Sequence, residues 1–570
     1  MSFGFALALP ALQQSFAFSP LSLFADGSQG AWYDNSNMST LFQDSAGTTP
    51  AVLESPVGLQ LDLSKGLVLG SEISLPLTSA TGWTLSAGTV TISGGALRFS
   101  AAATNAFAYQ ATLTIGAVYS VTYTIANYVS GAMSLEGDGA IIGASRTANG
   151  TYTETIRLSS TNKLYFFITS GSATLDITAI SVKQIAGNHR SQATSANRPT
   201  LSARYNLLTK TEQFDNAAWL KAYGSVTANT IAAPDGTITA DTFTVGTASQ
   251  QNTVSQTPAG TAGITTTLSC YIKAGTATWV AMGSNATAAD FGYFNVTTGT
   301  LGSRTGLVTA SSIVGAGSGW YLCSVTLALA ATQNRTIQIT AANGTYVSGS
   351  VGDSIYIWGA DLRPTDQTVT LPAYQRVDTS TVYDTAGFPQ YIKYNGSNQF
   401  LSTASVDFTA TAQMSVFAGV RKLSDAAFQL LVELSASTDT QPNAFCVLGS
   451  NTTGYYIQTG QSPNRTFGTP SAGSAAPITN VLTVVFDRTI ASTAQSKLRV
   501  NAGNFVLAPT IEGTGAAGNF GNYPLYFGMR AGTSLPFNGQ EYQMIIVGKT
   551  LTTAQITSTE TFVNNRTKAY

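Results

Sequence analysis

Apolar residues alternate with threonine or serine along many short stretches of this chain, and this alternation limits its fold more than any other feature. In residues 119–125, for example, Tyr, Val, Tyr and Ile occupy every second position, with Ser and Thr between them. Side chains two residues apart point to the same face of a strand, so such a stretch predicts a strand with one buried face. Turn residues such as Gly94 and Gly95 separate the stretches. We therefore predict an all-β chain made of several antiparallel β-sandwiches. The same period of two recurs in residues 90–92, 164–168, 414–420, 482–486, 525–529 and 542–546.

Length and composition exclude several classes of function. A chain of 570 residues is longer than one hydrophobic core usually serves, so we expect about three domains. Only 10% of the residues are charged and the net charge is -1, which leaves no basic surface for nucleic acid or for an anionic membrane. Three cysteines in the whole chain indicate neither a disulfide framework nor a zinc site. We expect no nucleic-acid partner and no membrane partner.

Short words near the start of the chain suggest a family. Residues 30–34 read GAWYD, residues 39–42 read STLF, residues 43–50 read QDSAGTTP and residues 56–58 read PVG. Together they resemble the opening of a family of tailed-bacteriophage and prophage virion proteins. Residues 187–206, GNHRSQATSANRPTLSARYN, are similar to the continuation of that opening in the same family.

A further resemblance concerns the C-terminal part of the chain. A strand up to Tyr394, an Asn395-Gly396 turn and a second strand near Phe400 resemble the start of a laminin-G or concanavalin-like sandwich. A helix is predicted from Thr553, because Thr552 and Gln555 form a capping-box pattern. The two resemblances imply that one laminin-G-like sandwich consists of three separated segments. They are residues 23–72, 187–205 and 371–570.

The two remaining blocks, residues 73–186 and 206–370, would then be insertions into loops of this sandwich. Their short, evenly spaced strands predict jelly rolls, and the first looks like a carbohydrate-binding-module jelly roll. The second carries words that resemble a jelly-roll module found in phage virion proteins. We interpret the two blocks as divergent repeats of one fold. The words are NLL at 206–208, EQFD at 212–215, APDG at 233–236, GWY at 319–321 and IWGA at 357–360.

The first 22 residues are apolar, but they do not have the pattern of a secretion signal. They lack a basic start, since the first Lys or Arg is Lys65, and Pro10 and Pro20 interrupt them. We predict no signal peptide and synthesis in the host cytoplasm. The segment is predicted to be extended and to dock onto other virion proteins; the alternative is a strand that packs against its own domain.

The residues that could support catalysis are sparse, and we assign no catalytic residue. His189 is the only histidine, and its Gly-Asn-His setting indicates a structural turn. Cys270 and Cys323 fall on apolar faces, which predicts buried free thiols. No nucleophile elbow, phosphate loop, zinc-ligand spacing or glycosidase carboxylate pair is recognisable.

Aromatic and acidic residues provide the candidates for binding. Trp279 and Trp83 are the candidate glycan contacts, because a flat indole face can stack on a sugar ring. Core packing is the expected role of Trp219, Trp320 and Trp358, which lie in the signature words. No cofactor is expected, except that four carboxylates are candidates for a structural calcium ion, with solvated or capping roles as the alternative. These four are Glu212, Asp215, Asp241 and Asp361.

Three hypotheses for function remain open. The first is a non-enzymatic virion protein of a tailed phage, a tail fibre or tail spike whose lectin-like domains bind host surface glycan. The second is a capsid decoration protein or head fibre. The third is a polysaccharide depolymerase, which the lack of a catalytic constellation disfavours. For the virion hypotheses we predict a homo-oligomer; the number of copies stays open, and a trimer is one form that fits. Since no heptad or collagen-like repeat is present, its contacts would come from domain surfaces or the N-terminal segment.

Overall fold

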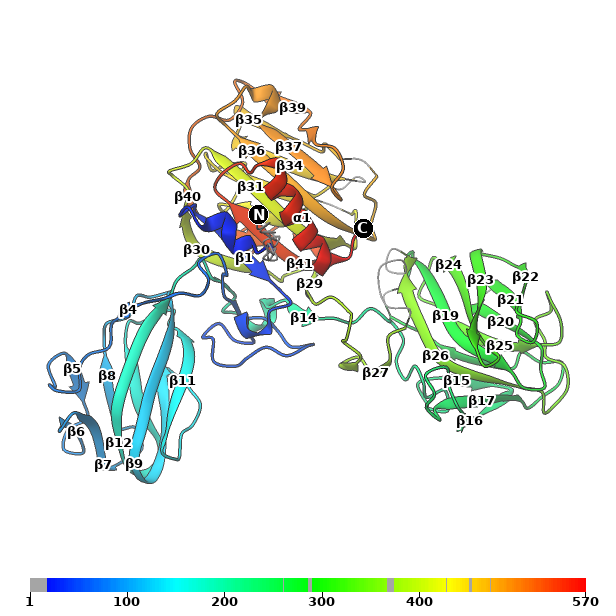
Figure 1. Ribbon diagram of the computed structural model, residues 1–570, viewed down its shortest axis with the longest axis horizontal. Coiled ribbons are helices and arrows are strands. Elements are labelled where there is room, and N and C mark those ends of the chain that lie inside the picture. The colour runs from blue at the N-terminus through cyan, green and yellow to red at the C-terminus, as the bar shows by residue number, and fades with distance from the viewer. Residues whose placement is uncertain are drawn as a thin grey trace, which may run out of the picture.

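The structure is a computed structural model that describes residues 18–259, 261–284, 290–365, 374–426, 428–450, 454–471 and 473–570. Figure 1 shows three β-rich bodies: a central sandwich that contains both the N-terminal and the C-terminal strands, and two jelly rolls, to the lower left and the right in this view. The prediction of an all-β chain of antiparallel sandwiches is confirmed. Among the described residues, no helix is both long and apolar enough to span a membrane.

The central body, called the sandwich below, has two sheets. The first follows the order β14-β29-β41-β31-β36-β37-β38, and β1 pairs with the part of β41 that β29 leaves open. Its strands are β1 (Gly30–Asp34), β14 (Thr200–Ser202), β29 (Tyr391–Asn395), β31 (Gln413–Lys422), β36 (Ile478–Asp487), β37 (Ser496–Val500), β38 (Val506–Leu507) and β41 (Asn538–Val547).

The second sheet of the sandwich follows the order β2-β3-β13-β30-β40-β32-β33-β34-β35-β39. Its strands are β2 (Leu41–Phe42), β3 (Leu59–Gln60), β13 (Arg190–Ser191), β30 (Leu401–Asp407), β32 (Gln429–Leu434), β33 (Phe445–Gly449), β34 (Tyr455–Gln461), β35 (Asn464–Gly468), β39 (Thr510–Glu512) and β40 (Asn522–Phe527).

Three segments that are far apart in the sequence meet in these two sheets. β1 runs antiparallel to β41, with Trp32 opposite Ile545 and Tyr33 opposite Met544. β14 pairs with β29 in the same sheet, while β13 lies between β3 and β30 in the other. The chain therefore leaves the sandwich after its first segment and again after its second, and one jelly roll is formed in each interval.

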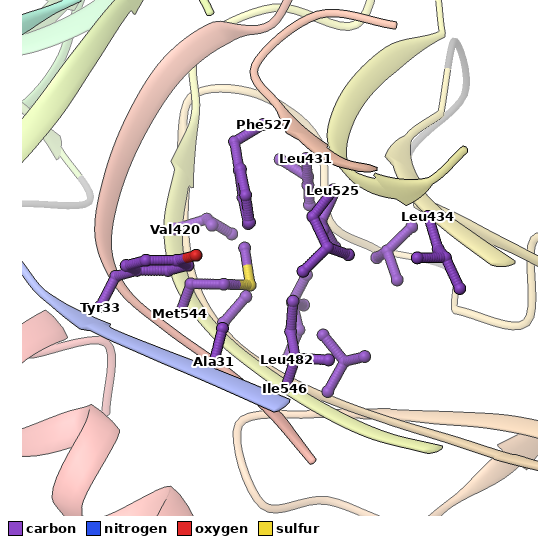
Figure 2. Close-up of a cluster of buried hydrophobic side chains, with 14 of the residues drawn as sticks. Ala31, Tyr33, Val420, Leu431, Leu434, Leu482, Leu525, Phe527, Met544 and Ile546 are labelled. Atoms are coloured by element: carbon purple, nitrogen blue, oxygen red, sulfur yellow. The ribbon is translucent and has the colours of Figure 1, made fainter. Parts of the chain in front are cut away.

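The core between the two sheets joins the first segment to the last. Figure 2 shows Ala31 and Tyr33 among Met544, Ile546 and Phe527 in a cluster that is almost fully buried. The rings of Tyr33 and Phe527 meet edge-on, with their centroids 5.3 Å apart. Burial of a large apolar side chain contributes about 1.5–3 kcal/mol. Core packing therefore holds β1 in place in addition to its backbone hydrogen bonds.

One expected domain boundary is corrected. Residues 69–72 fall in the range 23–72 that was assigned to the sandwich, yet they form β4 (Leu69–Glu72) and pair with the last strand of jelly roll 1. All four residues of β4 are exposed, so no apolar alternation marks which sheet they join. The boundary between 370 and 371 lies outside the described residues.

An α-helix covers the outer face of the first sheet. The predicted helix is confirmed as α1 (Thr553–Thr567), and the Thr552 side chain and Gln555 form the expected capping box. Ile556 and Val563 are buried in an apolar cluster that also contains Trp32. The 3₁₀ helices are η1 (Pro20–Phe24), η2 (Met38–Thr40), η3 (Ser195–Asn197) and η5 (Ser492–Ala494).

The N-terminal docking segment was predicted for residues 1–22, of which residues 1–17 lie outside the described part of the chain. The described remainder packs against α1. Phe18 lies 6.2 Å from Phe562 between ring centroids, and Leu23 and Phe24 are buried in the same cluster. Since η1 spans residue 22, a truncation that removes residues 1–22 would also cut into this packed element.

Jelly roll 1 is one continuous sheet, because two very long strands run through it. β9 pairs with β12 along most of their lengths, and register shifts bend the pair. Gly131 lies in this bend with φ +86°, and a Cβ there would come within 2.5 Å of Ala173. The strands are β5 (Trp83–Leu85), β6 (Val90–Ser93), β7 (Ala96–Ala102), β8 (Phe107–Gln110), β9 (Val118–Gly137), β10 (Ala140–Ile141), β11 (Gly150–Arg157) and β12 (Leu164–Ile185), together with β4.

Jelly roll 2 has two separate six-stranded sheets, and in this it differs from jelly roll 1. The first follows the order β15-β18-β25-β20-β21-β22, the second β16-β17-β26-β19-β24-β23. The strands are β15 (Leu220–Ala222), β16 (Gly224–Ile231), β17 (Ala240–Val245), β18 (Thr253–Gln256), β19 (Thr265–Ala274), β20 (Trp279–Ser284), β21 (Asp290–Asn295), β22 (Thr300–Arg304), β23 (Val308–Gly317), β24 (Trp320–Ala328), β25 (Arg335–Thr340) and β26 (Ser354–Pro364). A hairpin follows, formed by β27 (Val377–Thr379) and β28 (Val382–Tyr383).

Candidate functional site

The two candidate glycan-binding tryptophans occupy different environments. Trp83 is 8% exposed and belongs to the core of jelly roll 1, where its ring lies 6.2 Å from that of Phe166. It cannot offer a ring face to a sugar, because alternation placed it on the inner side of a strand; this expectation is corrected. Trp279 is half-buried on β20 and packs against Phe291 and Tyr293 on the side of the sheet away from the core. Its role as a glycan contact stays a prediction.

The four candidate calcium ligands are not brought together. Asp241 is buried and accepts backbone hydrogen bonds from Phe214 and Asn229, at 2.8 and 2.9 Å. Asp361 forms an ion pair with Arg363, and Asp215 is exposed. Among the described residues, no group of three His, Cys, Asp or Glu side chains could hold a metal ion. The calcium hypothesis for Glu212, Asp215, Asp241 and Asp361 therefore finds no geometric support.

The predicted free thiols are confirmed. Cys270 and Cys323 are buried and lie opposite each other on β19 and β24. Burial raises the pKa of both thiols, so neither is poised as a thiolate nucleophile.

His189 is held as a neutral imidazole in a buried turn. Its Nδ1 accepts a hydrogen bond from the backbone N–H of Asp62 at 2.9 Å, so Nε2 carries the proton and donates to the carbonyl of Ile185 at 2.9 Å. Burial lowers the pKa of His189, against the opposing effect of the Ile185 carbonyl and the Asp62 charge. Both ring nitrogens are committed to the backbone, which fits a structural role.

We expect the stability of the protein to fall as the pH falls below about 6.5, the pKa of histidine in an unfolded chain. In this pH range His189 is protonated in the unfolded state but stays neutral in the folded state, because its pKa is lowered there. A lower pH therefore favours unfolding. Melting temperatures between pH 7.5 and pH 5.5 should decline less steeply in His189→Gln. The single imidazole signal in an NMR titration should have its midpoint below that of a free histidine; a midpoint at or above it would contradict this account.

Two buried amide side chains fix the junction between jelly roll 2 and the sandwich. The side-chain oxygen of Gln375 accepts hydrogen bonds from the backbone N–H groups of Tyr205 and Asn206, at 2.8 and 2.9 Å. Its nitrogen donates to the carbonyls of Ala203 and Asp384, at 3.0 and 2.8 Å. This pair, Asn206 and Gln375, is called the amide junction below, and both members are fully buried.

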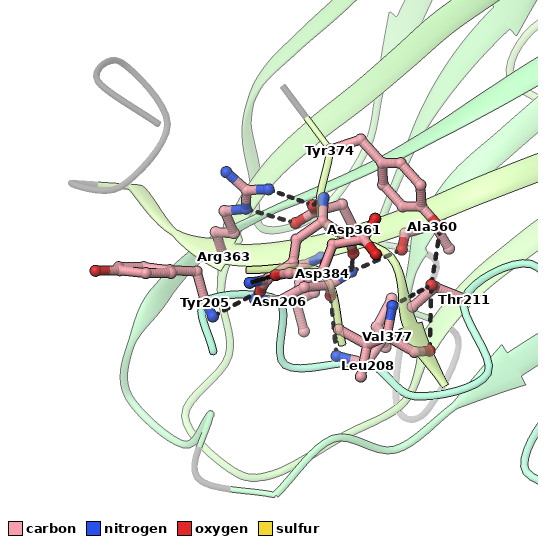
Figure 3. Close-up of polar contacts among 12 residues, drawn as sticks. Tyr205, Asn206, Leu208, Thr211, Ala360, Asp361, Arg363, Tyr374, Val377 and Asp384 are labelled. Carbon is pink, nitrogen blue, oxygen red and sulfur yellow. Dashed lines mark hydrogen bonds and ion pairs between the residues drawn. The ribbon is translucent and has the colours of Figure 1, made fainter. Parts of the chain in front are cut away.

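Asn206, in the segment that enters jelly roll 2, is the second member of the amide junction. Its side-chain nitrogen donates to the carbonyls of Ala360 and Gln375, and its oxygen accepts from the N–H groups of Leu208 and Leu362. Figure 3 shows this network beside the Arg363–Asp361 ion pair. These hydrogen bonds therefore join the segment that enters jelly roll 2 to the segment that leaves it. The side-chain oxygen and nitrogen of Asn206 and of Gln375 all have hydrogen-bond partners.

Beside the amide junction lies a cavity of about 510 Å³, which we call the hairpin cavity. Jelly roll 2 forms one wall and the β27–β28 hairpin forms the other. A volume of this size is typical of a site for a small ligand. Its lining residues are Thr211, Glu212, Gln213, Asn229, Thr239, Arg376, Val377, Asp378, Val382 and Tyr383.

An aromatic pair supports the jelly roll wall of the hairpin cavity. The rings of Trp358 and Tyr374 are 5.0 Å apart between centroids. The indole N–H of Trp358 donates to the Thr239 hydroxyl at 2.9 Å, and the Tyr374 hydroxyl donates to Glu212 at 3.0 Å. Burial raises the pKa of Glu212. The aromatic pair thus positions a hydroxyl and a carboxyl group that face the cavity.

The hairpin wall carries charges of both signs. Arg376 pairs with Asp384 at 3.0 Å on the surface, and Asp378 pairs with Lys210 at 2.5 Å. The Asp384 carboxylate raises the pKa of Arg376, whereas the hydrogen bond from Lys210 lowers the pKa of Asp378. The cavity therefore presents a guanidinium, carboxyl groups, amides and hydroxyls, a set that can donate to and accept from neighbouring hydroxyl groups of a ligand.

Sequence reasoning identified only one residue of this site. Glu212 was singled out from the word EQFD, but as a calcium ligand. Asn229, Arg376 and Asp378 carry no local signal, because they come from separate turns and strands that meet only in the folded chain.

No family model matches, and no curated protein matches. Among solved structures, the CBM40 module of Ruminococcus gnavus IT-sialidase bound to α2,3-sialyllactose is 16% identical, with a TM-score of 0.23 over 30% of this chain and 95% of that one. The tandem CBM22-1–CBM22-2 domain of Paenibacillus barcinonensis Xyn10C is 10% identical, with a TM-score of 0.23 over 52% of this chain and 98% of that one.

A third structure matches along nearly the whole chain. Trypanosoma rangeli sialidase in complex with 2,3-difluorosialic acid is 8% identical, with a TM-score of 0.22 over 97% of this chain and 99% of that one. TM-scores this low describe only a weak likeness to each of the three structures.

Proposed function

We propose that this chain is a non-enzymatic virion component of a tailed phage, of the tail-fibre or tail-spike type, that binds host surface carbohydrate in the hairpin cavity. The observation that carries the proposal is the lining of that cavity, where Glu212, Asn229, Thr239 and Arg376 present polar groups to one space. Sugars display several hydroxyls on a rigid ring, and they are bound by such sets of charged and amide groups. The virion part of the proposal rests on the resemblance of residues 30–58.

Weak individual sites are sufficient for such a role. A homo-oligomer, which we propose to be a trimer, presents several copies of the site to one cell surface, and linked sites gain avidity without tighter contacts. Light scattering on the purified chain should give about three times the mass of one chain, 59.3 kDa.

Arg376→Ala is expected to weaken binding to host-cell polysaccharide at least about tenfold, because a hydrogen bond to a charged group contributes about 1.5–3 kcal/mol. Arg376 is exposed, so the fold should persist. Arg98→Ala is the control, since the partly exposed Arg98 also forms an ion pair, with the buried Asp176, but lies in jelly roll 1. Biolayer interferometry on immobilised polysaccharide would measure both variants. An equal loss in both, or no loss in Arg376→Ala, would remove the hairpin cavity from the proposal.

The location on the particle separates the tail hypothesis from the head hypothesis. Immunogold electron microscopy with antibody against this chain should place label at the tail tip. Label over the head would favour a capsid decoration protein or head fibre, and particles without label would refute the virion assignment.

The hairpin cavity also contains the one observation that favours a depolymerase. Glu212 and Asp378 line the same space, and their pKa values are shifted in opposite directions. Opposite shifts are what an acid and a base in one site require. Release of reducing ends from host polysaccharide, lost in Glu212→Gln, would establish this second candidate function; intact polysaccharide would leave a binding protein.

A further inference from the structure

A second cavity, of about 540 Å³, lies between the sandwich and jelly roll 2 on the far side of Tyr383 from the hairpin cavity. We call it the interdomain cleft. Residues of all three chain segments of the sandwich line it, together with residues of jelly roll 2. The amide junction links the two bodies that form its walls.

The charged groups in the interdomain cleft are unbalanced. Among the described residues that line it, Arg204 after β14 and Lys393 on β29 lie near one carboxylate, Glu54; Arg421 on β31 also lines the cleft, but it has an interaction partner of its own. Glu54 is already engaged, because the hydroxyls of Ser202 and Tyr383 both donate to the same carboxylate oxygen. Arg204 and Lys393 therefore outnumber the one described carboxylate of the cleft, on a chain whose net charge is -1.

Two of these cations have no carboxylate partner among the described residues. The Arg204 guanidinium donates to the backbone carbonyls of Asn206, Leu207 and Leu208, at 2.9, 3.0 and 3.0 Å, and these carbonyls are neutral. Burial lowers the pKa of Arg204, because it is costly to hold the charge away from water, and the nearby charge of Glu54 opposes this effect only in part. Lys393 is exposed and forms no ion pair with a described residue. An anion bound in the cleft would provide a counter-charge for both Arg204 and Lys393.

The shape of the interdomain cleft favours a ligand larger than a simple ion. Its volume is in the range of small-molecule sites. Leu207, Ile264 and Leu423, which are partly exposed, give it an apolar wall next to the cations. An apolar wall beside basic groups matches a sugar that carries both a hydrocarbon face and a carboxylate.

We propose that the interdomain cleft binds an acidic sugar residue, with its carboxylate near Arg204 and Lys393. The proposal does not depend on the hairpin cavity, because Lys393 and Arg204 lie outside that site. The proposed binding of an acidic sugar also does not require the chain to be a virion protein.

The test uses saturation-transfer difference NMR on the full chain, with N-acetylneuraminic acid and glucuronic acid as acidic probes and glucose as the neutral probe. Phosphorus NMR line widths of inorganic phosphate provide the arm for a simple anion. The variants are Lys393→Glu, which reverses a charge on an exposed side chain, and Lys393→Arg, which keeps it. Arg204 is left unchanged, since its hydrogen bonds hold the chain at 206–208.

Signals from at least one acidic sugar are expected in the wild type and in Lys393→Arg. They should fall at least fivefold in Lys393→Glu and on addition of 0.5 M salt, because screening weakens charge pairing. Glucose should give no signal at equal concentration. Absence of acidic-sugar signals, equal signals in Lys393→Glu, or binding of phosphate alone would each overturn the proposal. Arg376→Ala should leave these signals unchanged, so failure here is distinct from failure of the hairpin cavity.

Discussion

Glu541→Gln is expected to lower the free energy of unfolding of the sandwich by about 3–5 kcal/mol, the usual cost of removing one partner of a buried ion pair. Arg190 is fully buried and donates to Glu541 through both terminal nitrogens, at 2.5 and 3.1 Å. It also donates to the side-chain oxygen of Gln60, at 2.6 and 2.9 Å. The amide of the variant would leave the guanidinium charge without a counter-charge inside the protein.

Because this ion pair joins distant chain segments, we expect its loss to destabilise the whole sandwich and not only the residues around it. Gln60 belongs to the first segment of the sandwich, Arg190 to the second and Glu541 to the last. The Arg190 guanidinium also lies over the rings of Tyr33 and Phe527, 4.3 and 4.7 Å from their centroids. Loss of the charge pair therefore weakens the contact between all three segments of the discontinuous domain.

Differential scanning calorimetry would resolve the transition of the sandwich from those of the jelly rolls. Asp26→Asn is the matched control, because Asp26 pairs with Lys549 on the surface of the same domain and should leave the transition unchanged. The double variant Arg190→Met with Glu541→Leu should lose less stability than Glu541→Gln alone, since it buries no unpaired charge. A Glu541→Gln transition within one degree of wild type would show that the pair contributes little.

Gln375→Leu is expected to separate jelly roll 2 from the sandwich. Leucine has a similar size but cannot replace the four hydrogen bonds of Gln375, so two buried N–H groups and two carbonyls lose their partner. Each unsatisfied buried group costs about 1–3 kcal/mol, and the sum is on the order of 4 kcal/mol or more. We expect the connections at residues 203–206 and 374–376 to open before either body unfolds.

Limited proteolysis and small-angle X-ray scattering would detect this opening. Cleavage near residues 203–206 should accelerate, and the radius of gyration should increase while both bodies keep their circular dichroism. Gln390→Leu is the control, because the side-chain oxygen of Gln390 is buried and already has no hydrogen-bond partner. Equal protection of Gln375→Leu and wild type would contradict the role of the amide junction.

The positions of many strands could be predicted from the sequence, because they depend on local information. The alternation at residues 119–125 and 414–420 lies in β9 and β31, and the Asn395-Gly396 turn follows β29 as expected, with Gly396 at φ +70°. The helix after Thr552 was predictable for the same reason, since a capping box involves residues three positions apart. A period of two also indicates that one face is buried.

The sequence pattern could not show which other parts of the chain pack against a given residue. This explains why the expectations for Trp83, for residues 69–72 and for the calcium ligands were wrong or unsupported. Trp83 looked like a free aromatic residue, but its strand turns it into the core. The exposed residues 69–72 have no apolar alternation, so their pairing with β12 was invisible. The four candidate calcium ligands come from different parts of jelly roll 2, and their carboxylates have different partners. Glu212 accepts from Tyr374, Asp241 from the backbone of Phe214, and Asp361 pairs with Arg363.

The sequence by itself therefore determined that this chain is all-β, since strand patterns repeat every two residues and need no knowledge of distant partners. Only the tertiary structure decided where the two cavities lie. The hairpin cavity joins residues 211–213 to residues 376–383, and the interdomain cleft joins Glu54 to Lys393 and Arg421. Such neighbours are set by the pairing of strands hundreds of residues apart and by the amide junction, and no local pattern encodes either.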